Sequence, residues 1–225
     1  MVAYLRSHPA GLHLGLMLAL TFSTGVIDAV GYLGLDKVFT GNMTGNVVIL
    51  GMALAGASGL PILGPVIALV AFMAGAAIAG RSLRGQPSGW HTRNTVLFGA
   101  VGVLLLAAAL VAFCCANRPE WLSFALTAAL GLAMGTQAGA ARHIGVADVT
   151  TVVVTSTIVG LAFDSVFGGG GNTRWARRAT AIVLIGLGAV IGALLVAMNI
   201  GLGMLLAAVI TIVAAVLGHL GRPHA

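Results

Sequence analysis

The sequence predicts an all-α polytopic membrane protein with six spanning helices and two short re-entrant or broken segments, arranged as two inverted repeats. Three observations predict it: an apolar composition, six long apolar runs and a polar motif that occurs twice. Hydrophobic residues make up 59% of the 225 residues and charged residues only 7%, whereas a soluble domain carries about 25% charge. The net charge of +6 is therefore assigned to loops beside a lipid bilayer, and no nucleic-acid partner is expected.

The six runs each reach the roughly 20 residues that a helix needs to cross the hydrocarbon core. They cover about 11–35, 60–80, 95–115, 121–141, 178–198 and 201–220. The first run follows Arg6 as the apolar part of a signal peptide would. However, it continues to Leu35 without a clear small-residue cleavage pattern, so we expect it to remain as the first span.

Two further apolar segments, 43–58 and 152–167, are too short to cross a core of ~30 Å as helices at ~1.5 Å per residue. Basic residues distinguish crossing from re-entrant segments. If both segments enter and leave on one side, nine of the eleven Lys and Arg residues share a face, and only Lys37 and Arg118 lie opposite. The positive-inside rule then places the loops 81–94 and 168–178 and both termini in the cytoplasm.

This order of segments predicts two copies of one unit, residues 1–116 and 117–225, within a single membrane domain. Each copy reads span, short segment, span, span, and three crossings per copy make the second inverted relative to the first. Asp28-Ala29 matches Gln137-Ala138 at an offset of 109, and Thr40 and Thr44 match Thr151 and Thr155 at 111. Inverted repeats with short, interrupted segments indicate a central transport site.

The candidate site residues are polar groups in otherwise apolar surroundings. Asp28 is a carboxylate within the first span, and we weigh two interpretations: binding a coupling ion or proton, or bonding between helices. The run Thr40 to Asn46 can unwind the backbone and start a helix inside the membrane, where free N–H groups suit an anion and free carbonyls a cation. A helix cap without ligand remains the alternative. The predicted substrate or ion site comprises Asp28, Thr40, Asn42, Thr44, Asn46, Gln137, Thr151, Thr155 and Thr157.

Other residues suggest no chemistry. No Cys/His spacing suits a metal, so neither a metal nor a cofactor is expected. No nucleophile, base and orienting residue can be assembled, so we expect no enzyme. Glycine-rich faces such as Gly186, Gly188 and Gly192 predict a homodimer or larger assembly.

The stretch Gly25 to Ala29, followed by VFTGNMTGN at 38–46, resembles the bacterial YoaK-like family of membrane proteins with a domain of unknown function. The regions Gly135-x-Gln137 and 154–157 are similar too, and the resemblance covers nearly the whole chain. It implies a bacterial cytoplasmic (inner) membrane protein and supplies no activity.

The leading hypothesis is a small secondary transporter or channel for a small solute or ion, with its site between the repeats. The competing hypothesis is a non-transporting membrane scaffold or accessory subunit, in which the same polar groups only tie helices together. A water-accessible polar cavity would favour the first, and mutually satisfied side chains in a dry core would favour the second.

Overall fold

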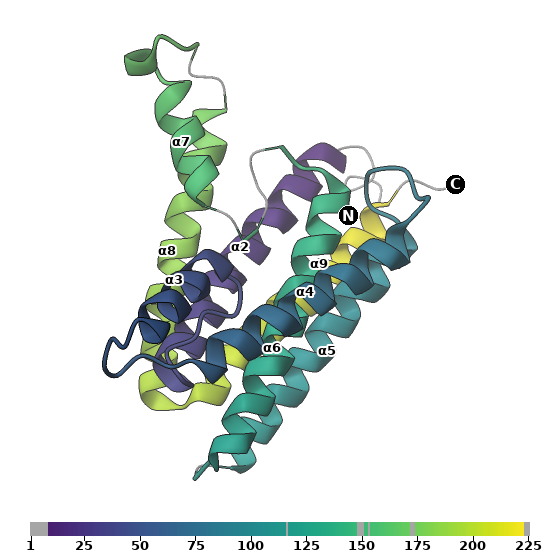
Figure 1. Ribbon diagram of the computed structural model, residues 1–225. Helices are drawn as coiled ribbons and strands as arrows, with labels where there is room; N and C mark the ends of the chain where they lie inside the picture. The colour runs from purple at the N-terminus through teal and green to yellow at the C-terminus, as the bar shows by residue number, and fades with distance from the viewer. Residues whose placement is uncertain (1–8, 116, 148–150, 153, 172–173, 223–225) are drawn as a thin grey trace.

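The computed structural model describes residues 9–115, 117–147, 151–152, 154–171 and 174–222. All regular structure in these residues is helical (Figure 1). Six helices are long: α2 (Pro9–Gly34), α4 (Leu63–Leu83), α5 (Thr92–Cys114), α6 (Glu120–Ile144), α8 (Trp175–Met198) and α9 (Ile200–Gly221). The short ones are α3 (Met43–Leu54), α7 (Thr155–Phe163) and the 3-10 turn η1 (Val166–Gly168).

The six long helices confirm the predicted spans, each within a few residues of the expected ends. All six have the length and hydropathy to cross a membrane. Large apolar side chains also point outward from them, for example Val183, Leu187 and Leu194 on α8. Such continuous exposed apolar surface is stable in lipid rather than in water. The short helices end earlier than predicted: α3 stops at Leu54 instead of residue 58, and α7 spans nine residues within the predicted 152–167.

Contacts between distant segments define the two ends of the bundle. At one end, His13 of α2 stacks on Trp90, His143 of α6 hydrogen-bonds the carbonyl of Gln86, and Arg222 after α9 bonds the Thr92 hydroxyl. We call this the basic end, because eight of the nine arginines predicted to share a face lie at helix ends here; Arg6 lies outside the described residues. They are Arg81, Arg84, Arg93, Arg142, Arg174, Arg177, Arg178 and Arg222.

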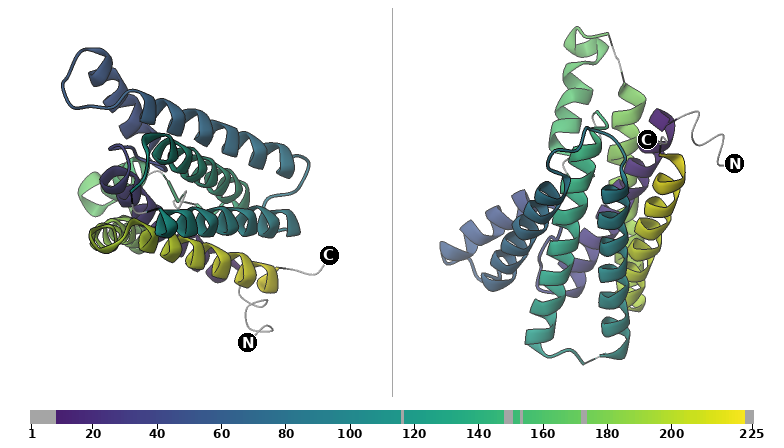
Figure 2. Two further views of the ribbon diagram at one scale, coloured as in Figure 1. Left: turned by 90° about the horizontal axis from the view of Figure 1, so that it is seen from below. Right: turned by 90° about the vertical axis from the view of Figure 1, so that its right-hand side faces the viewer.

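The opposite end holds the connections after α2, α3 and α5. The Lys37 ammonium donates to the carbonyl of Gly59 at 3.0 Å. Burial raises the pKa of Asp36, and the nearby Glu120 carboxylate raises it further, against the lowering effect of Lys37. In the right-hand view of Figure 2, the α5–α6 connection lies at the bottom and α7 at the top.

Both short helices enter and leave the bundle at a single end. The Lys37–Gly59 contact joins the chain before α3 to the chain after it, at the opposite end. In the second half, Arg177 at the start of α8 donates to the carbonyl of Ala147 just after α6, at the basic end. Figure 1 shows α7 beside the upper part of α8. The chain therefore crosses the bundle six times in the described residues, as the re-entrant interpretation requires.

Helix packing repeats between the two halves. The contacts α2–α8 and α4–α6 correspond under an exchange of halves, as do α2–α9 with α5–α6 and α3–α4 with α7–α8. Glycines make the first two crossings equally close. A Cβ at Gly25 would overlap the Ile185 carbonyl, and one at Gly135 would overlap the Phe72 carbonyl. Gly25 of α2 and Gly135 of α6 are 110 residues apart, and their contacts Phe72 of α4 and Ile185 of α8 are 113 residues apart.

A second pair of glycines follows the same offsets. A Cβ at Gly188 would overlap the Phe22 carbonyl, and one at Gly75 would overlap the Leu132 carbonyl.

The packing of Gly188 on α2 weakens the argument for the expected homo-oligomer. Gly188 and Gly192 pack on α2 within the chain, and only Gly186 has open space around it. Oligomerisation stays a prediction, with one glycine of the three available for it.

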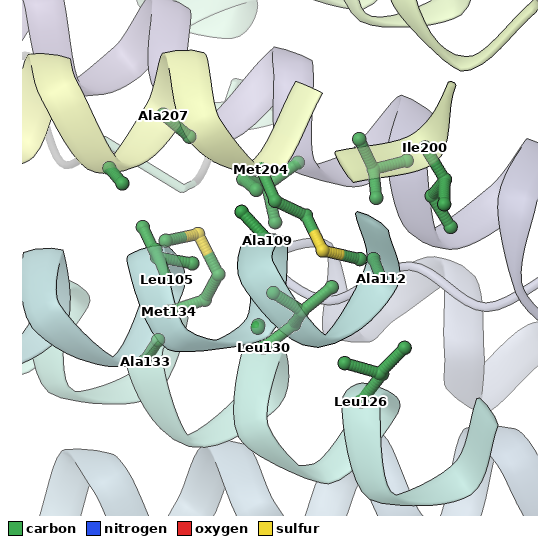
Figure 3. Close-up of a cluster of buried hydrophobic side chains, with 14 of the residues drawn as sticks. Leu105, Ala109, Ala112, Leu126, Leu130, Ala133, Met134, Ile200, Met204 and Ala207 are labelled. Atoms are coloured by element: carbon green, nitrogen blue, oxygen red, sulfur yellow. The ribbon is translucent and has the colours of Figure 1, made fainter. Parts of the chain in front are cut away.

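The centre of the bundle is apolar and lies among α5, α6 and α9. Figure 3 shows Leu105, Leu130, Met134 and Met204 between these helices, together with the small residues Ala109 and Ala207. Small residues let the backbones approach and long ones fill the space between them. The core also includes Ile27 and Val30 of α2, so it borders the segment around Asp28.

The topology predicts which loops react from each side of the membrane. In a chain with Cys114 and Cys115 replaced by serine, Ser88→Cys and Phe167→Cys should react with a membrane-impermeant maleimide only in inside-out vesicles. Both residues are exposed at the basic end. Ser58→Cys, exposed at the opposite end, should react only in intact cells. Labelling of positions 88 and 167 from opposite sides would contradict the re-entrant arrangement.

Candidate functional site

Asp28 organises the chain in front of α3. It lies six residues before the end of α2, which corresponds to about 9 Å along the helix. Its Oδ1 atom accepts backbone N–H groups from Thr40 at 3.0 Å, Gly41 at 2.7 Å and Asn42 at 3.4 Å. Gly41 is required for this approach, because a Cβ there would lie 2.8 Å from the Thr24 methyl. The carboxylate thus satisfies three consecutive amides that the membrane interior would otherwise leave without acceptors.

The two asparagines of the motif hold α3 to the same segment. The side chain of Asn42 caps α3 by accepting the Gly45 N–H at 3.2 Å. Asn46 is 1% exposed and bonds both backbone groups of Phe39, accepting its N–H at 2.9 Å and donating to its carbonyl. The Phe39 ring stacks on Tyr32 of α2, with centroids 4.9 Å apart. Each polar side chain therefore replaces a backbone partner that the unwound chain lacks.

A cavity of about 510 Å³ opens beside this segment. Its walls come from α2, α4, α6 and α8 and from the starts of both short helices. The residues that line it are Asp28, Gly41, Asn42, Met43, Thr44, Phe72, Ala76, Ala138, Gly139, Arg142, Val152, Val154, Thr155 and Ile185. Small-molecule sites have volumes of roughly 300–1,000 Å³ and apolar walls with a few polar groups. The cavity fits that description.

The start of α7 reaches this cavity from the basic end. Val154 and Thr155, at the start of α7, line the cavity, and the N-cap residue Val154 gives no side-chain hydrogen bond to the first turn. Just before it, Thr151 has a left-handed backbone with φ of 63°, and its buried hydroxyl has no partner among the described residues. At its other end α7 is tied to α8 by the Arg178–Asp164 ion pair at 2.6 Å. The two short helices therefore begin at one cavity and run from it toward opposite ends of the bundle.

The predicted site residues fall into two groups. Four of them, Asp28, Asn42, Thr44 and Thr155, line the cavity. The other five, Thr40, Asn46, Gln137, Thr151 and Thr157, are buried and are not part of its wall. The Thr40 hydroxyl donates to the Ile27 carbonyl, and the Gln137 amide donates to the Thr24 hydroxyl at 3.1 Å. The structure thus separates four wall residues from five that lie outside the wall, and a role in binding stays a prediction for all nine.

The glycine contacts change the alignment of the two halves. At the offset of 110 that relates Gly25 to Gly135, the position equivalent to Asp28 is Ala138 rather than Gln137. Ala138 lines the cavity as Asp28 does, and it likewise lies six residues before the end of its helix. The predicted match at 109 paired the two polar residues by type, whereas the close contacts of the backbone set the register one residue further on.

Arg142 lines the cavity but was not among the predicted site residues, since the sequence placed it only among the basic residues of the predicted cytoplasmic face. It lies in the last turn of α6, one turn beyond Ala138, and lines the cavity from the basic end. None of the described residues hydrogen-bonds its guanidinium. Arg142 lies four residues after Ala138, so both side chains lie on one face of α6. That spacing is the one feature of the sequence that could have indicated Arg142 as a wall residue.

Comparisons with known proteins identify a family and one curated relative. The family model described as "Protein of unknown function (DUF1275)" matches residues 16–217. The UPF0700 transmembrane protein YoaK of Bacillus subtilis (strain 168) is 31% identical over 187 residues, which cover 80% of this chain and 82% of that protein. No solved structure matches the chain. These matches confirm the resemblance drawn from the motif at 38–46 and a multi-pass membrane protein.

Proposed function

We propose that this chain, which belongs to the DUF1275 family, is a small secondary transporter or channel for a small solute or ion. We place it in the bacterial cytoplasmic membrane with both termini in the cytoplasm. The observation that carries the proposal is one cavity lined by the first residues of two short helices that enter from opposite ends. Interrupted helices that meet between two halves of a membrane protein are typical of transport sites.

The electrostatics of the wall support binding rather than packing. A helix start carries a partial positive charge, and the starts of both short helices line the same cavity. Asp28 and Arg142 add one formal charge of each sign. Charged and polar groups at this depth are costly unless they face water or a ligand, so their presence around an open volume favours a passage for solutes.

The matching helix contacts in the two halves support the inverted repeats that the proposal requires. In that arrangement, each half supplies one short helix and the two halves pivot about the site between them. The close crossings α2–α8 and α4–α6 both join one half to the other. Movement of one half would open the cavity first at the basic end and then at the opposite end.

A non-transporting scaffold or accessory subunit is the second candidate. It is favoured by the polar side chains that only support the fold, such as Asn46 on Phe39 and Gln137 on Thr24. The cavity distinguishes the two functions, because a scaffold needs no open volume between its halves. The proposal is for transport rather than catalysis, since the described wall offers hydroxyl, amide, carboxylate and guanidinium groups with no evident base beside a nucleophile.

Filling the cavity tests transport directly. Thr155 and Ser156 are neighbouring exposed residues in the first turn of α7, but only Thr155 lines the cavity. Thr155→Trp should therefore abolish solute movement while leaving the folded yield unchanged, and Ser156→Trp should retain both. The measurement is uptake into liposomes of solutes first selected by thermal-shift screening of the purified protein. Equal uptake by both tryptophan variants would contradict a route through this cavity.

A further inference from the structure

We propose that the cavity binds the carboxylate of its ligand at the start of α7, beside Ala138 and Arg142. This inference rests on the proposed function, because it names the ligand class of the same cavity. It comes from a difference between the two halves, which are alike in backbone packing and unlike in charge.

In the first half, the chain supplies its own carboxylate to the start of the short helix. Asp28 Oδ1 accepts three N–H groups from the segment that leads into α3. Its negative charge also offsets the partial positive charge at the start of α3. The Oδ1 atom of Asp28 is therefore occupied by backbone N–H groups of its own half.

In the second half, the equivalent carboxylate is missing. Ala138 stands at the position of Asp28, and it lines the cavity with only a methyl group where the first half has a carboxylate. The N-cap residue of α7, Val154, gives no side-chain hydrogen bond to the first turn. Arg142 lies one turn away along α6, about 6 Å from Ala138 along the axis. The start of α7 and the guanidinium of Arg142 thus lie beside Ala138, the position at which the first half has the carboxylate of Asp28.

An unsatisfied hydroxyl is a separate sign of a missing partner. Thr151 is 2% exposed, and its Oγ1 atom has no hydrogen-bond partner among the described residues. It adjoins Val152, which lines the cavity, and it corresponds to Thr40 of the segment that Asp28 holds. Buried polar groups without partners are rare in native proteins and mark places where a water, ion or ligand completes the site.

Thermal stability of the purified protein tests the proposal with matched probes. Acetate and lactate should raise Tm, whereas acetamide and lactamide, which have the same shape without the charge, should not. Sodium chloride at equal ionic strength is the control for general salt effects. Arg142→Gln should lower the apparent affinity for acetate and lactate, taken from the concentration dependence of Tm, about tenfold or more, as expected for loss of a hydrogen bond between charged groups. Arg84→Gln, which removes an exposed charge from the same end, should leave it unchanged.

A second variant builds the missing group into the chain. Ala138→Asp should raise Tm without any ligand and remove the response to acetate, because its own carboxylate occupies the site. Ala138→Asn, of the same size, should do neither.

Three results would overturn the proposal: equal responses to carboxylates and amides, an equal response to chloride, or Arg142→Gln behaving as Arg84→Gln. That last comparison decides the matter even if Ala138→Asp fails to fold. Carboxylate binding by a protein that moves no solute would remove only the transport function. Solute uptake without any carboxylate response would remove only this inference.

Discussion

Replacing Gly188 by valine is expected to abolish most of the folded protein, with a loss of about 3 kcal/mol or more in stability, at the upper end of overpacking effects. A Cβ at this position would overlap the Phe22 carbonyl and lie 3.2 Å from the Val26 amide nitrogen. These atoms belong to the backbone of α2, so no side-chain rotation can relieve the overlap. The two helices must separate, and the crossing that joins the two halves is lost. Fluorescence-detected size-exclusion yield and Tm measure the effect.

The same helix provides the control. Gly186 lies two residues earlier on α8 with open space around its Cα, so Gly186→Val should fold with nearly normal yield. Because Gly75 occupies the equivalent crossing between α4 and α6, Gly75→Val should fail as Gly188→Val does. A normal yield for Gly188→Val, or equal losses for the variants at 186 and 188, would contradict the close α2–α8 crossing.

The second large effect is expected at Asp28, where alanine and asparagine should differ. Asp28→Ala leaves the amides of Thr40, Gly41 and Asn42 without an acceptor. Each buried unsatisfied group costs about 1–3 kcal/mol, so a total loss of about 3 kcal/mol or more is expected. Asp28→Asn keeps an oxygen that can accept the same bonds at roughly half the strength, because the charge is gone. Thermal unfolding of both variants should therefore give a much smaller loss for asparagine.

Asp36→Asn is the matched control for removing a carboxylate. Burial and the Glu120 carboxylate raise the pKa of Asp36, so folding disfavours its charged form relative to the unfolded chain. The stability that it contributes is present at acidic pH and decreases as pH rises through its raised pKa. The neutral asparagine should consequently be tolerated at neutral pH. If Asp28→Ala were as stable as Asp36→Asn, the Oδ1 hydrogen bonds would not hold the segment before α3.

Asp28→Asn also separates the structural role of Asp28 from a coupling role. The asparagine variant is expected to fold, so its transport can be compared with that of the wild type at several pH values. A coupling carboxylate predicts that ion- or proton-dependent movement is lost in this variant, because the amide cannot titrate. Identical pH profiles would restrict Asp28 to its role in holding the segment from Thr40 to Asn42.

The sequence was informative about the site where residue type and depth together limit the possibilities. A run such as Thr40 to Asn46 within an apolar chain favours an unwound stretch that leads into a helix start. In the structure, residues 40–42 precede α3, Asn42 caps it, and Asn46 in its first turn bonds the backbone of Phe39. Which of these side chains face an open volume depends on the helices packed around them. That is why Asn42 lines the cavity and Asn46, four residues later, does not.

The sequence alone determined the class of the protein, its six spans and the two short segments, because length and hydropathy fix what can cross a bilayer. It also determined the distribution of basic residues between the two ends. Only the tertiary structure decided how the two halves align. An offset of 110 instead of 109 makes Ala138, rather than Gln137, the position equivalent to Asp28, while the hydropathy pattern stays the same. Close backbone contacts at Gly25, Gly75, Gly135 and Gly188 set that register. The same packing brings Arg142 to the cavity, because a helix end becomes part of a site only through the helices that meet there.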